Sequence, residues 1–175
     1  MNIPVIMTVI GQDQPGLVEA LSALIEKHHG NWEESRMARL SGQFAGILKI
    51  DLEESRLTAF QADSAALKSR GLNVVVVDHA EPVPNEEPGR QVQLDIVGHD
   101  QEGIVHRISQ TLAAHKINVE SFESNCESAP WSGEKLFKAN IELRIPDSLN
   151  IDDLRSDLEK IAEELMVDFT LNQSL

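Results

Sequence analysis

The fold of this chain is decided by the stretch Val5-Ile-Met-Thr-Val-Ile-Gly-Gln-Asp-Gln-Pro-Gly-Leu-Val18. An apolar run stops at a glycine, a short polar turn follows, and a second glycine precedes an apolar pair. This order predicts a buried strand, a tight turn and the first turn of an amphipathic helix. The same pattern recurs as Val92-Gln-Leu-Asp-Ile-Val-Gly-His-Asp-Gln-Glu-Gly-Ile-Val105.

The recurrence extends well beyond the quoted stretch. Residues 5–33 align with residues 92–120 without a gap, and the identical pairs are Val5/Val92, Gly11/Gly98, Asp13/Asp100, Gln14/Gln101, Gly16/Gly103, Val18/Val105, Ser22/Ser109, His28/His115, Asn31/Asn118 and Glu33/Glu120. Two copies are too few for a solenoid. We therefore predict two like domains, residues 1–80 and 92–175. Residues 81–91, which hold three prolines and three acidic residues, read as a stiff, exposed linker.

Periodicity places the elements of the first copy. A strand apolar on both faces is expected at 5–10 and is expected to end at Gly11. The helix that follows places Leu17, Val18, Leu21, Leu24 and Ile25 on one face. Asp13 or Gln14 is expected to cap its start, and Gly30 to supply the left-handed residue at its end. Strands at 31–40 and 44–52, a helix at 57–70 and a strand at 72–77 complete the copy.

The second copy repeats this order, with strands at 92–97, 119–127, 136–145 and 167–171 and helices near 104–112 and 151–165. The sequence β-α-β-β-α-β predicts an α+β chain of two ferredoxin-like domains. Each is an antiparallel sheet with both helices on one face. The strand at 74–77 is apolar on both sides, so we expect its outer face to be covered by the other domain or another subunit, which predicts a homo-oligomer.

Composition narrows the classes of function. The chain has 175 residues, 15 basic and 29 acidic, and a formal charge of −14. Without a basic cluster it is not expected to bind nucleic acid directly, and the acidic surface either keeps it soluble or meets a basic protein partner. A single cysteine, Cys126, suits a reducing compartment. No stretch is long and apolar enough to span a membrane. We expect a cytoplasmic protein.

The turn after each first strand is the candidate binding site. Gly11 and Gly16 are expected to let the backbone approach a ligand, because glycine has no Cβ. Free N–H groups at the start of the helix suit a carboxylate. Asp13 offers an anionic acceptor for an ammonium group, and Asn31 follows the far end of the helix. These features match the two charges of a zwitterion.

The turns Gly11-Gln-Asp-Gln-Pro-Gly16 and Gly98-His-Asp-Gln-Glu-Gly103, with Asn31 and Asn118 beyond their helices, resemble the ACT domain. The resemblance covers nearly the whole chain, and a stand-alone tandem of this kind is most similar to the glycine cleavage system transcriptional repressor group. It implies a non-catalytic regulator without a cofactor. Such a regulator senses a small amino acid, with glycine as the family-level choice, and acts through a protein partner such as a DNA-binding regulator.

The same resemblance implies which residues form the two sites. Asp13, Gln14, Gly16 and Asn31 would form one site, and Asp100, Gln101, Gly103 and Asn118 the other, with Gly11, Gly98 and His99 beside them. Glu102 replaces Pro15 in the second copy and adds negative charge. Trp32 stands where the family usually has a small aliphatic residue. The first site is therefore preferred.

The sequence also allows other interpretations. In one interpretation, Asp13 and Asp100 only cap their helices and bind no ligand. In another, the protein is a ligand-free scaffold that dimerises and recruits a partner. A small hydrolase or isomerase using His99 and Asp100 would need an activated nucleophile that the sequence does not supply. The histidines lack metal-site spacing and are expected at the surface or at helix ends. Cys126 has no nearby basic residue to activate it.

Overall fold

The computed structural model describes residues 1–78, 88–128 and 133–173. The chain divides into two compact units, Met1–Pro84 and Asn85–Leu175. Residues 81–87 of the linker expected at 81–91 lie outside the described residues. From Gly89 onward the chain already forms the first strand of the second unit.

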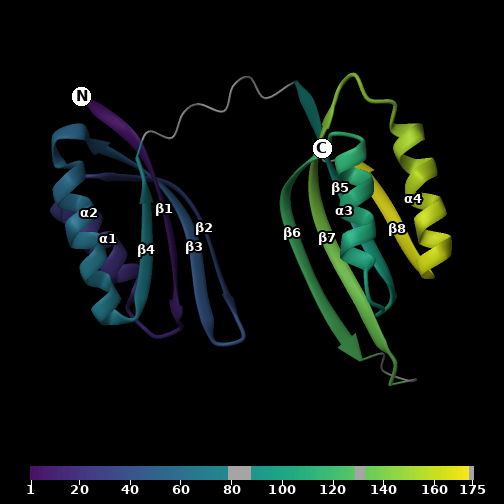
Figure 1. Cartoon of the computed structure of the whole chain (residues 1–175), viewed down its shortest axis with the longest axis horizontal. Helices are drawn as coiled ribbons and strands as arrows, with labels where there is room; N and C mark the ends of the chain where they lie inside the picture. The colour runs from purple at the N-terminus through teal and green to yellow at the C-terminus, as the bar shows by residue number, and fades with distance from the viewer. Residues whose placement is uncertain (79–87, 129–132, 174–175) are drawn as a thin grey trace. The chain divides into compact units, whose positions relative to one another are not determined.

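The first unit follows the predicted order (Figure 1). Its elements are β1 (Asn2–Gln12), α1 (Leu17–Lys27), β2 (Asn31–Leu40), β3 (Gln43–Glu53), the 3₁₀ turn η1 (Glu54–Arg56), α2 (Leu57–Ala66), the 3₁₀ turn η2 (Leu67–Arg70) and β4 (Leu72–Val77). The strands form an antiparallel sheet in the order β2-β3-β1-β4. Both helices cover one face of it.

The second unit has the same architecture. It consists of β5 (Gly89–His99), α3 (Ile104–Ala114), β6 (Asn118–Ser128), β7 (Lys135–Pro146), α4 (Ile151–Leu165) and β8 (Val167–Gln173), with the sheet order β6-β7-β5-β8. The two units also share an irregularity of strand pairing. The pairing of β2 with β3 shifts register between Trp32 and Glu34, and the pairing of β6 with β7 shifts between Val119 and Ser121. The prediction of two ferredoxin-like α+β folds is confirmed.

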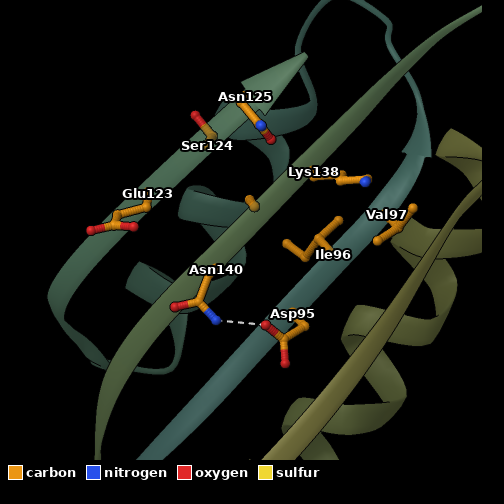
Figure 2. Close-up of a pocket in the computed structure, with 9 residues that line it drawn as sticks. Asp95, Ile96, Val97, Glu123, Ser124, Asn125, Lys138 and Asn140 are labelled. Atoms are coloured by element: carbon orange, nitrogen blue, oxygen red, sulfur yellow. Dashed lines mark hydrogen bonds between the residues drawn. The ribbon is translucent and has the colours of Figure 1, made fainter. Parts of the chain in front are cut away.

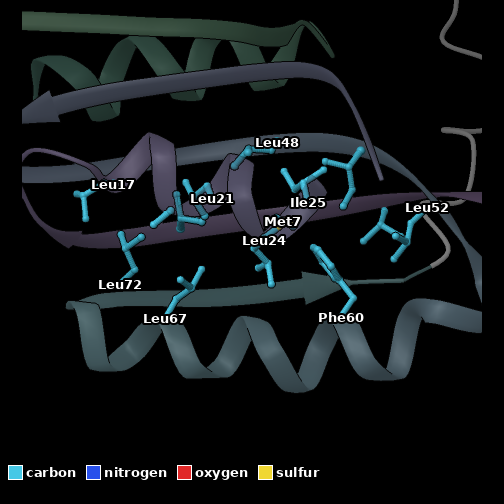
Figure 3. Packing of buried hydrophobic residues seen from close by; sticks show 14 of the residues in the cluster. Met7, Leu17, Leu21, Leu24, Ile25, Leu48, Leu52, Phe60, Leu67 and Leu72 are labelled. Carbon is cyan, nitrogen blue, oxygen red and sulfur yellow. The ribbon is translucent and has the colours of Figure 1, made fainter. Parts of the chain in front are cut away.

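Each unit has its own apolar core between sheet and helices. In the first unit, alternate residues of β1 point inward, and Val5 and Met7 are fully buried. They meet the apolar face of α1, whose Leu21 is also fully buried (Figure 3). The period-2 pattern of the strand and the 3.6-residue period of the helix bring the apolar side chains to one layer. A separate cluster of the same kind fills the second unit.

Two local expectations were wrong. β1 does not end at Gly11, because Gly11 pairs with Phe44 and the strand continues to Gln12. The left-handed residue after α1 is His29, with φ of 56°, and not Gly30. The N–H of Gly30 donates to the Ile25 carbonyl and that of His29 to Glu26. This is the hydrogen-bond pattern of a Schellman end. Lys116, also with φ of 56°, repeats it after α3.

The outer faces of the two sheets differ in chemistry. On the first sheet, the face opposite the helices exposes Ile10, Ile47, Val75 and Val77 by 53%, 47%, 59% and 48%. The sequence predicted that β4 would be apolar on both sides, and these exposures agree with it. On the second sheet, the corresponding face carries polar residues such as Asp95 and Asn140.

Candidate functional site

The turn before each first helix is built on a left-handed glycine. Gly16, with φ of 92°, is the N-cap residue of α1, and Gly103, with φ of 89°, is that of α3. An L-residue with a side chain is strained at such angles. No side chain caps either helix, so the expectation that Asp13 or Gln14 caps α1 was wrong. The first N–H groups of each helix have no intrahelical partner.

Gly11 and Gly98 serve the packing of the sheet. A Cβ on Gly11 would lie 2.1 Å from the carbonyl oxygen of Gly71, directly before β4. A Cβ on Gly98 would lie 2.5 Å from Val167 Cγ1 and 2.8 Å from the carbonyl oxygen of Met166, directly before β8. These glycines therefore allow a close approach of the protein's own backbone, and the expectation that Gly11 opens space for a ligand was wrong.

Gln14 and Gln101 tie the turn to the end of the second helical segment. The Gln14 side-chain amide donates to the carbonyl of Arg70 at 2.7 Å. The Gln101 amide donates in the same way to the carbonyl of Leu165, at the end of α4. Carbonyls at a helix end lack intrahelical partners, so each glutamine satisfies one of them. One N–H donor of each side-chain amide is therefore engaged within its own unit.

Asp13 is neutralised by an arginine of the neighbouring hairpin. Its carboxylate lies 2.7 Å from Arg39 Nε, and its side chain is 29% exposed. The N–H of Asp13 donates to the Gly42 carbonyl at 2.9 Å, which fixes the turn against the β2–β3 hairpin. The guanidinium therefore lies where an ammonium group of a ligand would have to pair with Asp13.

Asp100, the repeat of Asp13, has a different neighbour. Arg39 pairs with Phe44 in the first sheet and Cys126 with Phe137 in the second, so Cys126 takes the place of Arg39. Partial desolvation, and then the charge and hydrogen bond of Asp100, raise the pKa of the Cys126 thiol. The thiol stays neutral and brings no positive charge to the turn. Among the described residues, no cation forms an ion pair with Asp100. The arginine-to-cysteine change thus makes the two turns electrostatically unequal.

The remaining predicted residues lie further from the turns. His99 is exposed, and its Nδ1 is 3.7 Å from Glu134 Oε2. Asn31 begins β2 and pairs with Asp51, whereas the turn adjoins the opposite end of β3 at Gln43. Eight residues of strand separate these ends, about 26 Å at the usual rise. Asn118, whose amide donates to Glu120 Oε1 at 2.8 Å, is displaced in the same way. Within a unit, the structure does not bring either asparagine to its turn.

Sequence reasoning missed a histidine–aspartate pair in which the histidine is buried and the aspartate partly exposed. His28 is 7% exposed, and its Nε2 lies 2.8 Å from Asp63 Oδ2 on α2. The pair recurs as His115 and Asp157, at 3.0 Å. The identity of His28 and His115 in the repeat was the available signal, but the spacing of residues along one segment does not reveal a partner on another helix. Each pair links the two helices of its unit.

The first pair makes the stability of the protein depend on pH. The hydrogen bond from Lys27, followed by that from His28, lowers the pKa of Asp63. A carboxyl whose pKa is lower in the folded state stabilises the fold above its unfolded-state pKa, and this contribution is lost as the pH falls through the folded-state value. We expect Asp63→Asn to lower the thermal midpoint at pH 7. The difference from wild type should shrink at pH 3. Glu26→Gln, which removes an exposed acid of α1, is the charge-matched control, and an equal effect of both variants would contradict the prediction.

The described residues hold neither a metal-binding cluster nor a membrane-spanning helix. No group of three or more His, Cys, Asp or Glu side chains in this part of the chain is arranged to hold a metal ion. Within the same ranges, no helix combines the length and apolar character needed to cross a membrane.

Comparison with known proteins assigns both units to one family. Residues 4–75 and residues 89–163 each match a family model described as the ACT domain. Over 170 residues the chain is 22% identical to the glycine cleavage system transcriptional repressor of Escherichia coli (strain K12), covering 95% of this chain and 88% of that protein.

Solved structures agree with this result along the whole chain. An unknown protein from Galdieria sulphuraria superposes with a TM-score of 0.86 at 28% identity, and all of both chains is covered. The structure of a protein proposed to be a glycine cleavage system transcriptional repressor superposes with a TM-score of 0.71 at 20% identity, covering 98% of this chain and 97% of that one. The latter likeness establishes the fold alone.

Proposed function

Because this chain belongs to the ACT-domain family, with two ACT domains in tandem, we propose that it is a non-catalytic, cytoplasmic regulator that senses a small amino acid. The proposed ligand is glycine, and the proposed output is control of transcription through a protein partner that binds DNA. The likeness to the Escherichia coli repressor supports this role. The charge of −14 argues against direct contact with DNA.

The observation that carries the proposal is the turn before α3. The N–H groups of the first turn of α3 point at the space before the helix and suit a carboxylate. Asp100 supplies the opposite charge beside them, and its only described polar side-chain partner is the neutral thiol of Cys126. Glu102 is exposed, so water screens its repulsion. An α-amino acid with a small side chain has both of the complementary charges.

We favour the second turn over the first as the ligand site. The sequence favoured the first turn, but there Arg39 already neutralises Asp13. A ligand ammonium would have to displace that guanidinium before it paired with the carboxylate. We therefore propose that the ligand binds at Asp100 and Gly103, and not at Gly98, which packs against Val167 and Met166. Asn31 and Asn118 do not reach the turn of their own unit and are left out of the proposed site.

Isothermal calorimetry with a panel of amino acids tests this proposal. We expect heat with glycine or another small amino acid, and an affinity at least about tenfold weaker in Asp100→Ala, because a charge-assisted hydrogen bond contributes about 1.5–3 kcal/mol. Cys126→Arg should weaken binding similarly, since it recreates the ion pair of the first unit. Asp13→Ala is the matched control, and its affinity should stay near wild type.

A ligand-free scaffold is the second candidate. It is favoured by the exposed apolar outer face of the first sheet, with Ile10, Ile47, Val75 and Val77, because such patches mark association surfaces. The same calorimetry separates the two. Absence of heat with every amino acid, together with a stable oligomer in analytical ultracentrifugation, would support the scaffold and reject the sensor.

A further inference from the structure

The outer face of the second sheet holds a hydrogen-bonded polar cluster centred on Asp95. Asp95 lies in the middle of β5, on the face turned away from α3 and α4 (Figure 2). Its carboxylate accepts from Asn140 Nδ2 at 2.6 Å, from Gln93 Nε2 at 3.1 Å and from Asn172 Nδ2 at 3.3 Å. The three amides come from three adjacent strands, so the cluster spans the width of β7, β5 and β8.

This arrangement determines what the face offers to a partner. An ionised carboxylate only accepts hydrogen bonds, so each amide must turn its NH₂ group toward Asp95. The carbonyl oxygens of Gln93, Asn140 and Asn172 take no part in these bonds and remain hydrogen-bond acceptors. One half-buried negative charge is thereby surrounded by acceptors. A group that donates several hydrogen bonds and carries positive charge is the complement of such a surface.

A hollow beside Asp95 gives this surface a shape. Its volume is about 540 Å³, and its lining includes Asp95, Asn140 and Lys138 together with Glu123 and Asn125 of β6. Figure 2 shows Asp95 and Asn140 joined by their hydrogen bond across neighbouring strands. The ammonium of Lys138 is held by Glu127 at 2.7 Å. The charges left to a partner are therefore those of Asp95 and Glu123, both negative.

The first unit shows that the fold does not require this cluster. Strand register places Thr8 where the second unit has Asp95, and Ile47 where it has Asn140. Val77 occupies the position of Asn172, and Ile6 that of Gln93. The same sheet is thus stable with an apolar outer face. Four polar residues joined in one network are consequently a specific property of the second unit.

We propose that the outer face of the second sheet, centred on Asp95 and Glu123, is a docking surface for a basic segment of a partner protein. Arginine is the expected contact residue, because its planar guanidinium donates several hydrogen bonds in a fixed geometry. The hollow extends over β5, β6 and β7. A peptide segment that crosses these strands can donate hydrogen bonds to more of the acceptors in the hollow than a single small amine can. The chain's charge of −14 draws a cationic partner toward the surface.

The docking surface gives the protein partner of the proposed function a chemistry, that of a basic segment. It rests on the proposed function only because it presupposes that such a partner exists. Its failure is distinguishable from that of the amino-acid sensor. Substitutions of Asp95 and Glu123 on the sheet report on peptide binding, whereas substitution of Asp100 in the turn reports on amino-acid binding. Loss of one leaves the other measurable in the same protein.

The test is an NMR titration of the ¹⁵N-labelled full chain with the peptide acetyl-Gly-Arg-Gly-Arg-Gly-Arg-Gly-amide. We expect shift changes concentrated at amides of β5, β6 and β7 around Asp95. Asp95→Asn and Glu123→Gln should each weaken peptide affinity by about tenfold, as expected when one charged partner is lost. Glu163→Gln, which removes an exposed acid of α4 on the helical side, should leave the affinity unchanged.

Three results would overturn the proposal. Shift changes spread evenly over the acidic surface, α4 included, would indicate unspecific attraction. Equal affinity losses in Asp95→Asn and Glu163→Gln would indicate the same. Free argininamide binding as tightly as the peptide would assign the hollow to a small amine. Because Glu123 is exposed, its variant keeps the test decisive if Asp95→Asn fails to fold.

Discussion

Replacement of Gly11 by alanine is expected to destabilise the first unit by about 3 kcal/mol or more, because the new methyl group meets backbone that cannot move cheaply. Its Cβ would lie 2.1 Å from the carbonyl oxygen of Gly71 and 3.2 Å from Leu72 Cδ2. Relief requires β4 to shift away from β1, which breaks the pairing of Gly11 with Leu72.

Gly16→Ala is the matched control for this prediction. A Cβ there has no atom within 4 Å, and only the φ of 92° opposes it, so the cost should be about 1–2 kcal/mol. Urea unfolding followed by the fluorescence of Trp32, which packs against the first core, reports on this unit in a Trp131→Phe background. Equal midpoints for Gly11→Ala and Gly16→Ala would contradict the steric explanation.

The second large effect is expected at Phe60. This side chain of α2 is fully buried, and its ring contacts that of His28 edge-on, with 5.4 Å between ring centroids and an interplanar angle of 88°. Truncation to alanine removes a buried aromatic ring and leaves a cavity, at a cost of about 3–5 kcal/mol. The cavity would also remove the wall against which His28 packs while it contacts Asp63.

Phe60→Leu should cost less than about 1.5 kcal/mol if the core repacks around the smaller side chain. The second unit supports this expectation, because Leu154 lies three residues before Asp157 as Phe60 lies three residues before Asp63, and it is fully buried. The same Trp32 fluorescence assay measures both variants. A loss for leucine as large as that for alanine would show that the ring itself, and not filled volume, stabilises this position.

Much of the fold could be predicted because its signals are local. The apolar run of β1 and the helical spacing of Leu17 to Ile25 are both determined within a few residues of chain. The repeat added a second, independent copy of each signal. Positions of strands and helices therefore agreed with the structure to within a few residues.

The candidate site was harder to predict because its chemistry depends on contacts between distant segments. Nothing near Asp13 in the sequence reveals that Arg39 neutralises it. A glycine beside a turn can serve ligand binding, backbone conformation or close packing. At Gly11 the structure shows close packing against the backbone of Gly71, just before β4. Asp95, one of several polar residues in β5, resembles any solvated residue until its three amide donors are located.

The glutamine of each turn has a mechanical consequence. Gln14 holds the carbonyl just before Gly71, and Gln101 holds the carbonyl just before Met166. The strands that begin there, β4 and β8, are the outermost strands of their sheets. We therefore expect a displacement of either turn to shift the start of a strand at the edge of its own sheet. A ligand that moves the turn should thereby change how readily the edge strand pairs with another strand.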